Sequence, residues 1–317
     1  MRGRERSLFF GTLGLFAIAC GTRTGLLSDE NGTLPDGSFD AGKDVKDATR
    51  DRLGDVIDED SPGFDASKPD STPPNDCPDA GATLVYLITQ GGELVSFYPP
   101  SLTFKTIGTI SCPSAPMTTP FSMGVNRTGT AYIVFSDGHL FEVSTATASC
   151  KATGYKVDQL GWNTFGMGFS GDNMGESLYV SESKTGVPQS KGLAIIDTKS
   201  FLLNFVSTFS PPIPRSELTG TGDGRLFAYW PNFQSSGSHI AQIDRKTANV
   251  TGIDDLQIGG PNDAFAFAFW GGVFWVFTSP SGPSTVTKFD PMTLSETNVT
   301  TYSGTIVGAG VSTCAPQ

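Results

Sequence analysis

The chain has 317 residues, of which 38% are hydrophobic and 17% are charged, and its formal net charge is −11. No cluster of Lys and Arg occurs beyond the first twenty residues, which argues against nucleic acid as a partner. The two histidines, His139 and His239, lie a hundred residues apart, and no cysteine is in a CxxC or Cys/His motif. The sequence therefore predicts no metal site and no cofactor.

The first twenty residues predict export from the cytoplasm. Three arginines precede an uncharged, mostly apolar run from Leu8 to Ile18, which ends at Ala19 and Cys20. This order of a basic segment, an apolar segment and a small residue is typical of a secretory signal peptide. The apolar run is short for a membrane span, although an uncleaved anchor helix and an ordinary signal peptide remain alternatives.

The end of this segment, Ala17-Ile18-Ala19-Cys20, resembles the lipobox of bacterial lipoproteins. The resemblance implies a signal peptide over residues 1–19 and a diacylated thiol at Cys20, so that the protein is anchored in the bacterial envelope through a lipid. Gly21 follows the cysteine in place of the Asp that retains enteric lipoproteins at the inner membrane. The outer membrane is therefore the expected location.

Residues 20–80 are expected to be an acidic, disordered linker. From Gly21 to Ala80 the chain carries fifteen Asp or Glu and six Lys or Arg, with many Pro and Gly residues. Such a segment cannot bury enough apolar surface to offset the entropy lost on ordering. Most of the negative charge of the chain thus belongs to this linker. A calcium-binding acidic repeat is disfavoured because its ligand spacing is missing.

The folded domain is predicted over residues 81–317, where short apolar runs recur with a regular period. A strand pattern follows each of these runs and ends at one anchor residue: Tyr98, Ser144, Asp197, Asp244 or Asp290. Successive anchors are 46, 53, 47 and 46 residues apart. A short polar side chain at the anchor can accept hydrogen bonds from its own turn.

A further strand with small residues precedes most of the apolar runs. Aligned, these strands place Gly124, Gly168, Gly220 and Ala268 in one column, and Gly310 completes it at the C-terminus. A period of 40–50 residues with four strands is typical of a β-propeller blade, in which small residues let the innermost strands approach each other. We therefore predict a five-bladed, all-β propeller of four-stranded antiparallel blades, closed by a C-terminal strand. A two-sheet sandwich would not explain the period.

Residues 126–145, NRTGTAYIVFSDGHLFEVST, resemble the turn–strand–turn–strand unit of NHL-like and Kelch-like propellers. The resemblance is specific for architecture and implies no particular activity, because propellers host unrelated chemistries.

Four cysteines remain once Cys20 is assigned to the lipid, and an even number in an exported chain predicts two disulfides. The closing strand, residues 307–312, is expected beside residues 83–89, which brings Cys314 close to Cys77. We therefore predict a Cys77–Cys314 bond. Cys112–Cys150 follows by elimination, although Cys112 is expected at the end of an outer strand and Cys150 at the start of one.

Long Pro-, Gly- and Ser-rich connections are expected on one face of the propeller, where these folds generally bind ligands. Aromatic residues interleaved with polar ones suit a carbohydrate or protein ligand. The candidate ligand-binding residues are Trp162, Arg215, Asn232, Phe233, Asn262 and Asp263, with Trp162 and Phe233 expected to be exposed. Trp230 and Trp270 are expected in the core between blades.

No catalytic fingerprint is present, so no catalytic residue is assigned. The leading interpretation is a lipid-anchored binding or scaffold module that acts as a monomer and is not an enzyme. The alternative is an envelope hydrolase or lyase with paired carboxylates at the axis. Only Asp172, Glu217 and Asp223 come from the axial strands or their turns, and each is expected to be a solvated turn residue. His139 and His239 are expected at turns or strand edges.

Overall fold

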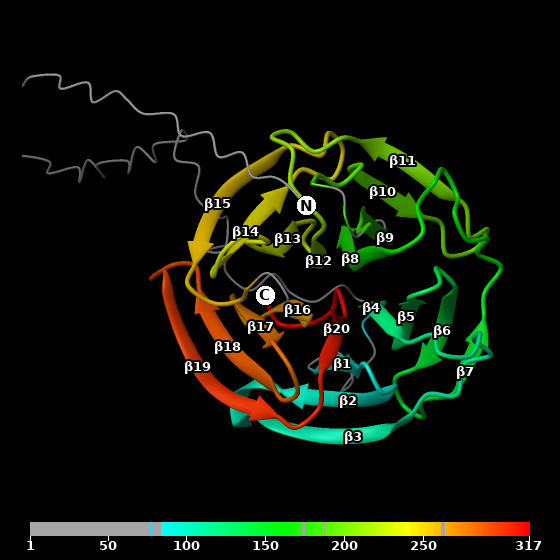
Figure 1. The fold of residues 1–317 in the computed structure, drawn as a ribbon, viewed down its shortest axis with the longest axis horizontal. Coiled ribbons are helices and arrows are strands. Elements are labelled where there is room, and N and C mark those ends of the chain that lie inside the picture. The colour runs from blue at the N-terminus through cyan, green and yellow to red at the C-terminus, as the bar shows by residue number, and fades with distance from the viewer. Residues whose placement is uncertain (1–76, 78–83, 173–174, 185, 187, 261–263) are drawn as a thin grey trace, which may run out of the picture. The chain divides into compact units, whose positions relative to one another are not determined.

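The computed structural model describes residue 77 and residues 84–172, 175–184, 186, 188–260 and 264–317. The predicted signal peptide, Cys20 and the linker up to residue 76 lie outside these residues, as do Asn262 and Asp263. Within the described part of the chain, twenty strands form five four-stranded antiparallel sheets. Figure 1 shows the sheets as five blades around a central axis, which confirms the predicted propeller.

Each blade follows the chain from the axis outward, except that the C-terminal strand is the innermost strand of blade 1. Blade 1 contains β20 (Ile306–Val311), β1 (Val85–Thr89), β2 (Glu93–Tyr98) and β3 (Thr103–Thr109). Blade 2 contains β4 (Pro120–Val125), β5 (Thr130–Phe135), β6 (Leu140–Ser144) and β7 (Cys150–Ala152). Blade 3 contains β8 (Phe165–Asp172), β9 (Gly175–Glu182), β10 (Leu193–Ile196) and β11 (Leu203–Ser207).

Blade 4 contains β12 (Glu217–Gly220), β13 (Leu226–Pro231), β14 (Ser238–Ile243) and β15 (Val250–Leu256). Blade 5 contains β16 (Ala264–Trp270), β17 (Val273–Ser279), β18 (Ser284–Asp290) and β19 (Ser295–Tyr302). A short 3-10 helix, Pro99–Ser101, follows β2. No helix in the described part of the chain is long and apolar enough to cross a membrane.

Ring closure depends on the pairing of β20 with β1, which joins the two ends of the domain (Figure 1). Val311 is opposite Val85, and Ala309 is opposite Leu87. Both partners of each pair are buried in the cluster between blades 1 and 5. The closing strand therefore completes a sheet and a hydrophobic cluster at once, and it covers the edge that β1 would otherwise expose.

The glycine column lies where the inner strands approach each other most closely. A Cβ atom added at Gly168 would lie 2.6 Å from the carbonyl oxygen of Leu218 on the next inner strand. One added at Gly310 would lie 2.7 Å from Val125 Cγ2. At these positions a larger side chain would clash with the neighbouring inner strand and force the two strands apart. This explains why the column contains only Gly and Ala.

The second strand of each blade lies between neighbouring blades, so it is buried on both faces. β1 and β13 are buried at every position. Phe97 of blade 1 packs against Trp275 and Phe277 of blade 5, with ring centroids 5.3 Å and 5.9 Å apart. Because both faces are buried, these strands have continuous apolar runs and do not alternate between apolar and polar residues.

The anchor residues close the turns between the third and fourth strands. Asp244 Oδ1 accepts backbone hydrogen bonds from Lys246 at 2.8 Å and Thr247 at 2.7 Å. Asp197 makes the same pair of bonds in blade 3, while Tyr98 in blade 1 provides no side-chain bond. The predicted role of the anchor is thus confirmed for the aspartates and for Ser144, whose Oγ accepts a 3.3 Å hydrogen bond from the backbone N–H of Ala146.

Both disulfides are present, with the predicted pairing: Cys77–Cys314 and Cys112–Cys150. Cys150 begins the outer strand β7, as expected. The expectation for Cys112 was wrong, because β3 ends at Thr109 and Cys112 lies in the connection to blade 2. There it packs in one cluster with Cys150 and Ala148, so the bond joins two blades without an irregular strand.

Candidate functional site

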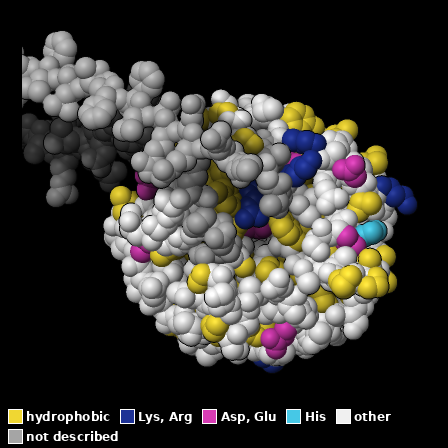
Figure 2. All heavy atoms as spheres, viewed as in Figure 1, with side chains coloured by type: hydrophobic (Ala, Val, Ile, Leu, Met, Phe, Trp, Pro, Cys, Tyr) yellow, Lys and Arg dark blue, Asp and Glu magenta, His cyan; other side chains and the backbone are white. Residues whose placement is uncertain are grey.

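Charged side chains gather around the propeller axis. In Figure 2 basic side chains lie at the centre of the ring next to acidic ones, whereas much of the surrounding face is uncharged. The five inner strands begin on one face, called here the pocket face, with first residues Pro120, Phe165, Glu217, Ala264 and Ile306. They end on the opposite face, called here the clasp face, beside the Cys77–Cys314 bond.

A cavity of about 160 Å³ opens at the axis on the pocket face. Its apolar walls come from the first two positions of three inner strands, and Gln90 and Thr119 add polar groups from the connections. Arg215 and Glu217 are the charged residues of the described lining. The apolar lining residues are Pro120, Phe121, Ala264, Phe265 and Val307.

Arg215 lies just before β12, and two aromatic rings hold its guanidinium. The Cζ atom is 4.6 Å from the centroid of the Phe233 ring and 5.6 Å from that of Phe265. No described residue forms an ion pair or a hydrogen bond with this guanidinium. Burial lowers the pKa of Arg215, and the nearby Glu217 opposes that effect.

Glu217 corrects the prediction of a solvated turn carboxylate. It is the first residue of β12 and only 5% of its surface is exposed. Burial raises the pKa of this carboxyl well above its usual value, and the hydrogen bond from Ser122 and the charge of Arg215 only partly offset burial. The neutral acid is therefore favoured far more than in a solvated glutamate.

The position of Glu217 is fixed by neighbouring blades. Ser122 Oγ of β4 donates a 2.5 Å hydrogen bond to Glu217 Oε2, and it accepts a 3.2 Å bond from the backbone N–H of Met167 in β8. The inner strands of blades 2, 3 and 4 thus meet at this carboxyl. A side chain held from three blades is preorganised rather than mobile.

Two ion pairs lie at the ends of the inner strands on the clasp face. Glu176 Oε2 lies 3.6 Å from Arg127 Nε and accepts a 2.7 Å hydrogen bond from Thr313. Asp223 lies 3.0 Å from Arg225 Nε, and its side chain is only 11% exposed, which corrects its prediction as a solvated residue. Burial alone would raise the pKa of Asp223. Hydrogen bonds from Thr221 and Arg225 outweigh burial, so the pKa is lowered.

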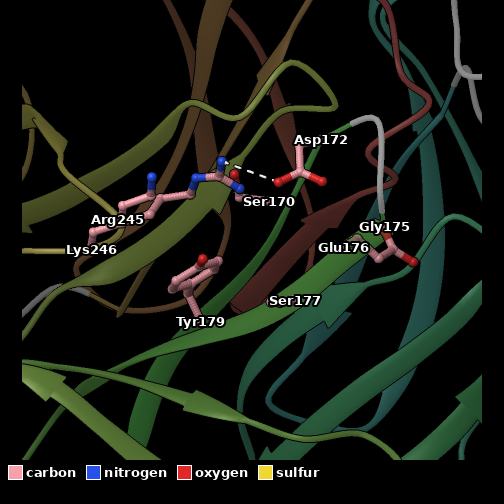
Figure 3. A pocket seen from close by; sticks show the side chains of 8 residues that line it. All are labelled: Ser170, Asp172, Gly175, Glu176, Ser177, Tyr179, Arg245 and Lys246. Atoms are coloured by element: carbon pink, nitrogen blue, oxygen red, sulfur yellow. Dashed lines mark ion pairs between the residues drawn. The ribbon is translucent and has the colours of Figure 1, made fainter.

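A second cavity, of about 320 Å³, lies between blades 3 and 4 toward the clasp face. Figure 3 shows Arg245 and Asp172 facing each other across it, with Tyr179 below them. Arg245 is 3.7 Å from Asp172 Oδ2 and donates a 3.3 Å hydrogen bond to the carbonyl of Gly171. Arg245 and Asp172 pair with each other, and Glu176 pairs with Arg127, so three of the four charged residues of the described lining already have partners.

The structure brings together only part of the predicted ligand-binding group. Arg215 and Phe233 meet near the axis, and Asn232 supports the same loop by accepting a hydrogen bond from Gln234. Trp162 was expected to be exposed, and this was wrong: it is 1% exposed and packs with Tyr155 and Phe165. Asn262 and Asp263 lie outside the described residues.

The remaining predicted positions agree better with the structure. Trp230 is buried between blades, while Trp270 is partly buried. His139 follows a turn and its side chain is half-exposed beside Asp137, and His239 is the second residue of β14, 2.7 Å from Asp255. No three potential metal ligands cluster within the described ranges.

Sequence reasoning missed Phe121, Phe265 and Gln90, which line the axial cavity. The two phenylalanines are at the second position of their inner strands, next to the predicted connections. The shared strand position is the signal that could have identified them. Gln90 follows β1 and carries no such signal.

Comparisons with protein-family models and with curated protein sequences find no match. Among solved structures, a chain of a nidogen–laminin complex is similar with a TM-score of 0.48 and 10% identity, over 72% of this chain and 97% of that one. TolB from Acinetobacter baumannii has a TM-score of 0.40 and 12% identity, over 69% of this chain and 51% of that one, so the chain spans about half of it. The putative TolB from Agrobacterium tumefaciens has a TM-score of 0.37 and 12% identity, over 68% of this chain and 69% of that one.

Proposed function

We propose that this protein is a non-enzymatic binding module of the bacterial envelope that receives its ligand at the axial cavity of the pocket face. One observation carries the proposal: a preformed cavity combines aromatic walls with a guanidinium that no described residue pairs. Concave, mostly apolar cavities with a few polar groups are the usual form of ligand sites. A carbohydrate or a protein segment fits this description.

Export and anchoring complete the proposal. Two disulfides indicate an oxidising, extracytoplasmic compartment. The lipobox-like segment supports a lipid on Cys20 and a place at the outer membrane, with the acidic linker between the lipid and the propeller. A diacyl anchor is stable where a single chain is only marginal. Cys20→Ser should therefore abolish fatty-acid labelling and release the protein from membranes, and unchanged partitioning would refute the anchor.

The enzymatic alternative is less well supported. A hydrolase or lyase of the predicted type needs two carboxylates facing each other across the substrate. In the described lining of the axial cavity, Glu217 is the single acidic residue. A binding role therefore accounts for the site with fewer assumptions.

Blocking the cavity tests the binding role. Ala264 lies on the cavity wall at the start of β16, so Ala264→Trp should fill the space without altering a charge. The exported protein and this variant are compared on glycan and peptide arrays carrying envelope-derived ligands. We expect at least a tenfold loss of binding in the variant, with an unchanged melting temperature. Ligands bound equally by both proteins would refute the axial cavity as the binding site.

A further inference from the structure

Arg215 and its surroundings identify a ligand chemistry for the axial cavity. We propose that this cavity binds the carboxylate of a small organic acid, with Arg215 holding the carboxylate and Phe121 and Phe265 contacting the carbon skeleton. This inference rests on the proposed binding function and specifies the ligand class.

The N–H groups of the Arg215 guanidinium can donate hydrogen bonds to a ligand. Arginine carries five N–H donors, and contact with the rings of Phe233 and Phe265 uses none of them. The ring contacts nonetheless favour one placement of a long side chain, which reduces the entropy lost when an anion binds. A planar carboxylate can accept two parallel hydrogen bonds from such a fork.

Glu217 does not take the place of the missing anion. It is two residues from Arg215, yet it forms no ion pair with it, and its Oε2 is occupied by the hydrogen bond from Ser122. Burial also favours the neutral form of this acid, because its pKa is raised. The guanidinium of Arg215 therefore has no ion-pair partner in the described lining, and the carboxylate of a ligand can take that place.

The size and walls of the cavity favour a small monoanion. A volume of about 160 Å³ is a few times that of a water molecule in liquid, about 30 Å³ each. A single cation matches one negative charge, whereas a doubly charged phosphate would bring a second charge that this largely apolar lining does not balance. Phe121 and Phe265 provide apolar surface for the carbons, and Gln90 and Thr119 provide hydrogen-bonding groups.

Two sources can supply the same chemistry: an acidic sugar and the free C-terminal residue of a peptide. The experiment is calorimetry on the exported protein with matched pairs of probes. Glucuronate is compared with glucose, and N-acetylalanine with its amide. In at least one pair the acid should bind ten times or more tighter than its neutral partner, and the pair that shows this identifies the source.

Three variants locate the interaction. Arg215→Gln should lose at least tenfold in affinity for the acid and little for the neutral partner, while Arg215→Lys should keep part of the difference. Lys105→Gln, an exposed cation on β3, is the matched control and should bind like the unaltered protein. A melting temperature for each variant shows that the propeller remains folded.

The outcomes separate this inference from the proposed function. If acid and neutral probes bind equally, if neither acid binds, or if Arg215→Gln leaves the difference intact, the carboxylate site is refuted. The binding role stands in those cases as long as Ala264→Trp abolishes ligand binding on the arrays. If Ala264→Trp also has no effect on any bound ligand, the proposed function fails as well.

Discussion

The two ends of the propeller axis contain the same residue types in opposite states of pairing. On the clasp face, Arg127 pairs with Glu176 and Arg225 with Asp223. On the pocket face, the Arg215 guanidinium has no ion-pair partner among the described residues. The nearby acid, Glu217, is held by Ser122 instead.

This difference separates stability from function. Ion pairs, hydrogen bonds and a disulfide link blades at the clasp face, which stabilises the closed ring. A partly buried cation without an ion-pair partner among the described residues costs stability, and proteins accept such costs where a ligand is bound. The comparison predicts that substitutions at the two ends have unequal effects.

The largest effect is expected at the disulfide of the clasp face. Cys77 and Cys314 are separated by 237 residues, against 38 for Cys112 and Cys150. Under the chain-entropy argument, replacing the first pair by alanine should cost about 5 kcal/mol and replacing the second about 4 kcal/mol. Urea unfolding of both double variants measures the difference. A larger loss for the Cys112/Cys150 variant would show that closure at the clasp face is not the dominant constraint.

The arginines provide the direct comparison. Arg127→Met leaves Glu176 without its charged partner in a nearly buried site, which should cost about 3 kcal/mol. Arg215→Met loses contacts with two rings, worth about 1 kcal/mol, but removes the desolvation of an unpaired cation. We therefore expect the unfolding free energy to change by less than about 1 kcal/mol there. Equal losses at both sites in denaturant titrations would contradict the asymmetry.

The repeating elements were predicted from the sequence, and so was the pairing of the two disulfides, whereas much of the axial cavity was missed. Glycines 168 and 310, the anchor Asp244 and the closing strand recur at fixed spacing, so each copy supports the others. The axial cavity combines residues from several inner strands and their connections, and apart from the shared strand position of Phe121 and Phe265 no local pattern relates them.

The wrong predictions of exposure for Trp162 and Glu217 have one cause, which is contact between residues far apart in the sequence. Trp162 is flanked by polar residues and is nonetheless buried, because its loop folds back over blades 2 and 3. Glu217 is in a turn-like sequence, PRSEL, and its environment depends on Ser122, 95 residues away. Burial set by contacts so distant in sequence cannot be read from neighbouring residues.

The raised pKa of Glu217 should make the free energy of unfolding depend on pH. Its folded-state pKa is raised, so the native protein holds the proton at pH values where the unfolded chain has released it. Stability from this group is therefore fully present below its usual pKa of 4.5 and falls as the pH rises through the folded-state pKa. The slope for one proton is at most about 1.4 kcal/mol per pH unit.

Glu217→Gln isolates this contribution. The unfolding free energy of the unaltered protein, minus that of the variant, should decrease between pH 4.5 and 8. Asp197→Asn is the control of opposite sign, because backbone N–H groups of Ser200 and Lys199 lower the pKa of Asp197. A difference for Glu217→Gln that is constant with pH would show that this carboxyl titrates as in the unfolded chain.

The smallest effect is expected in the turns between third and fourth strands, which lie on the clasp face. Each contains a residue other than glycine with positive φ, and Leu294, at φ 53°, is 64% exposed. This conformation places Cβ close to the following carbonyl oxygen, and glycine avoids that contact. Because glycine also loses more entropy on folding, Leu294→Gly should stabilise the protein by only about 0.5 kcal/mol.

Leu202, which is 58% exposed and has no positive φ, is the matched control, and Leu202→Gly should destabilise by about 0.5–1 kcal/mol. Thermal unfolding of both variants tests the comparison, and a loss of stability at both positions would show that the turn conformation is not strained.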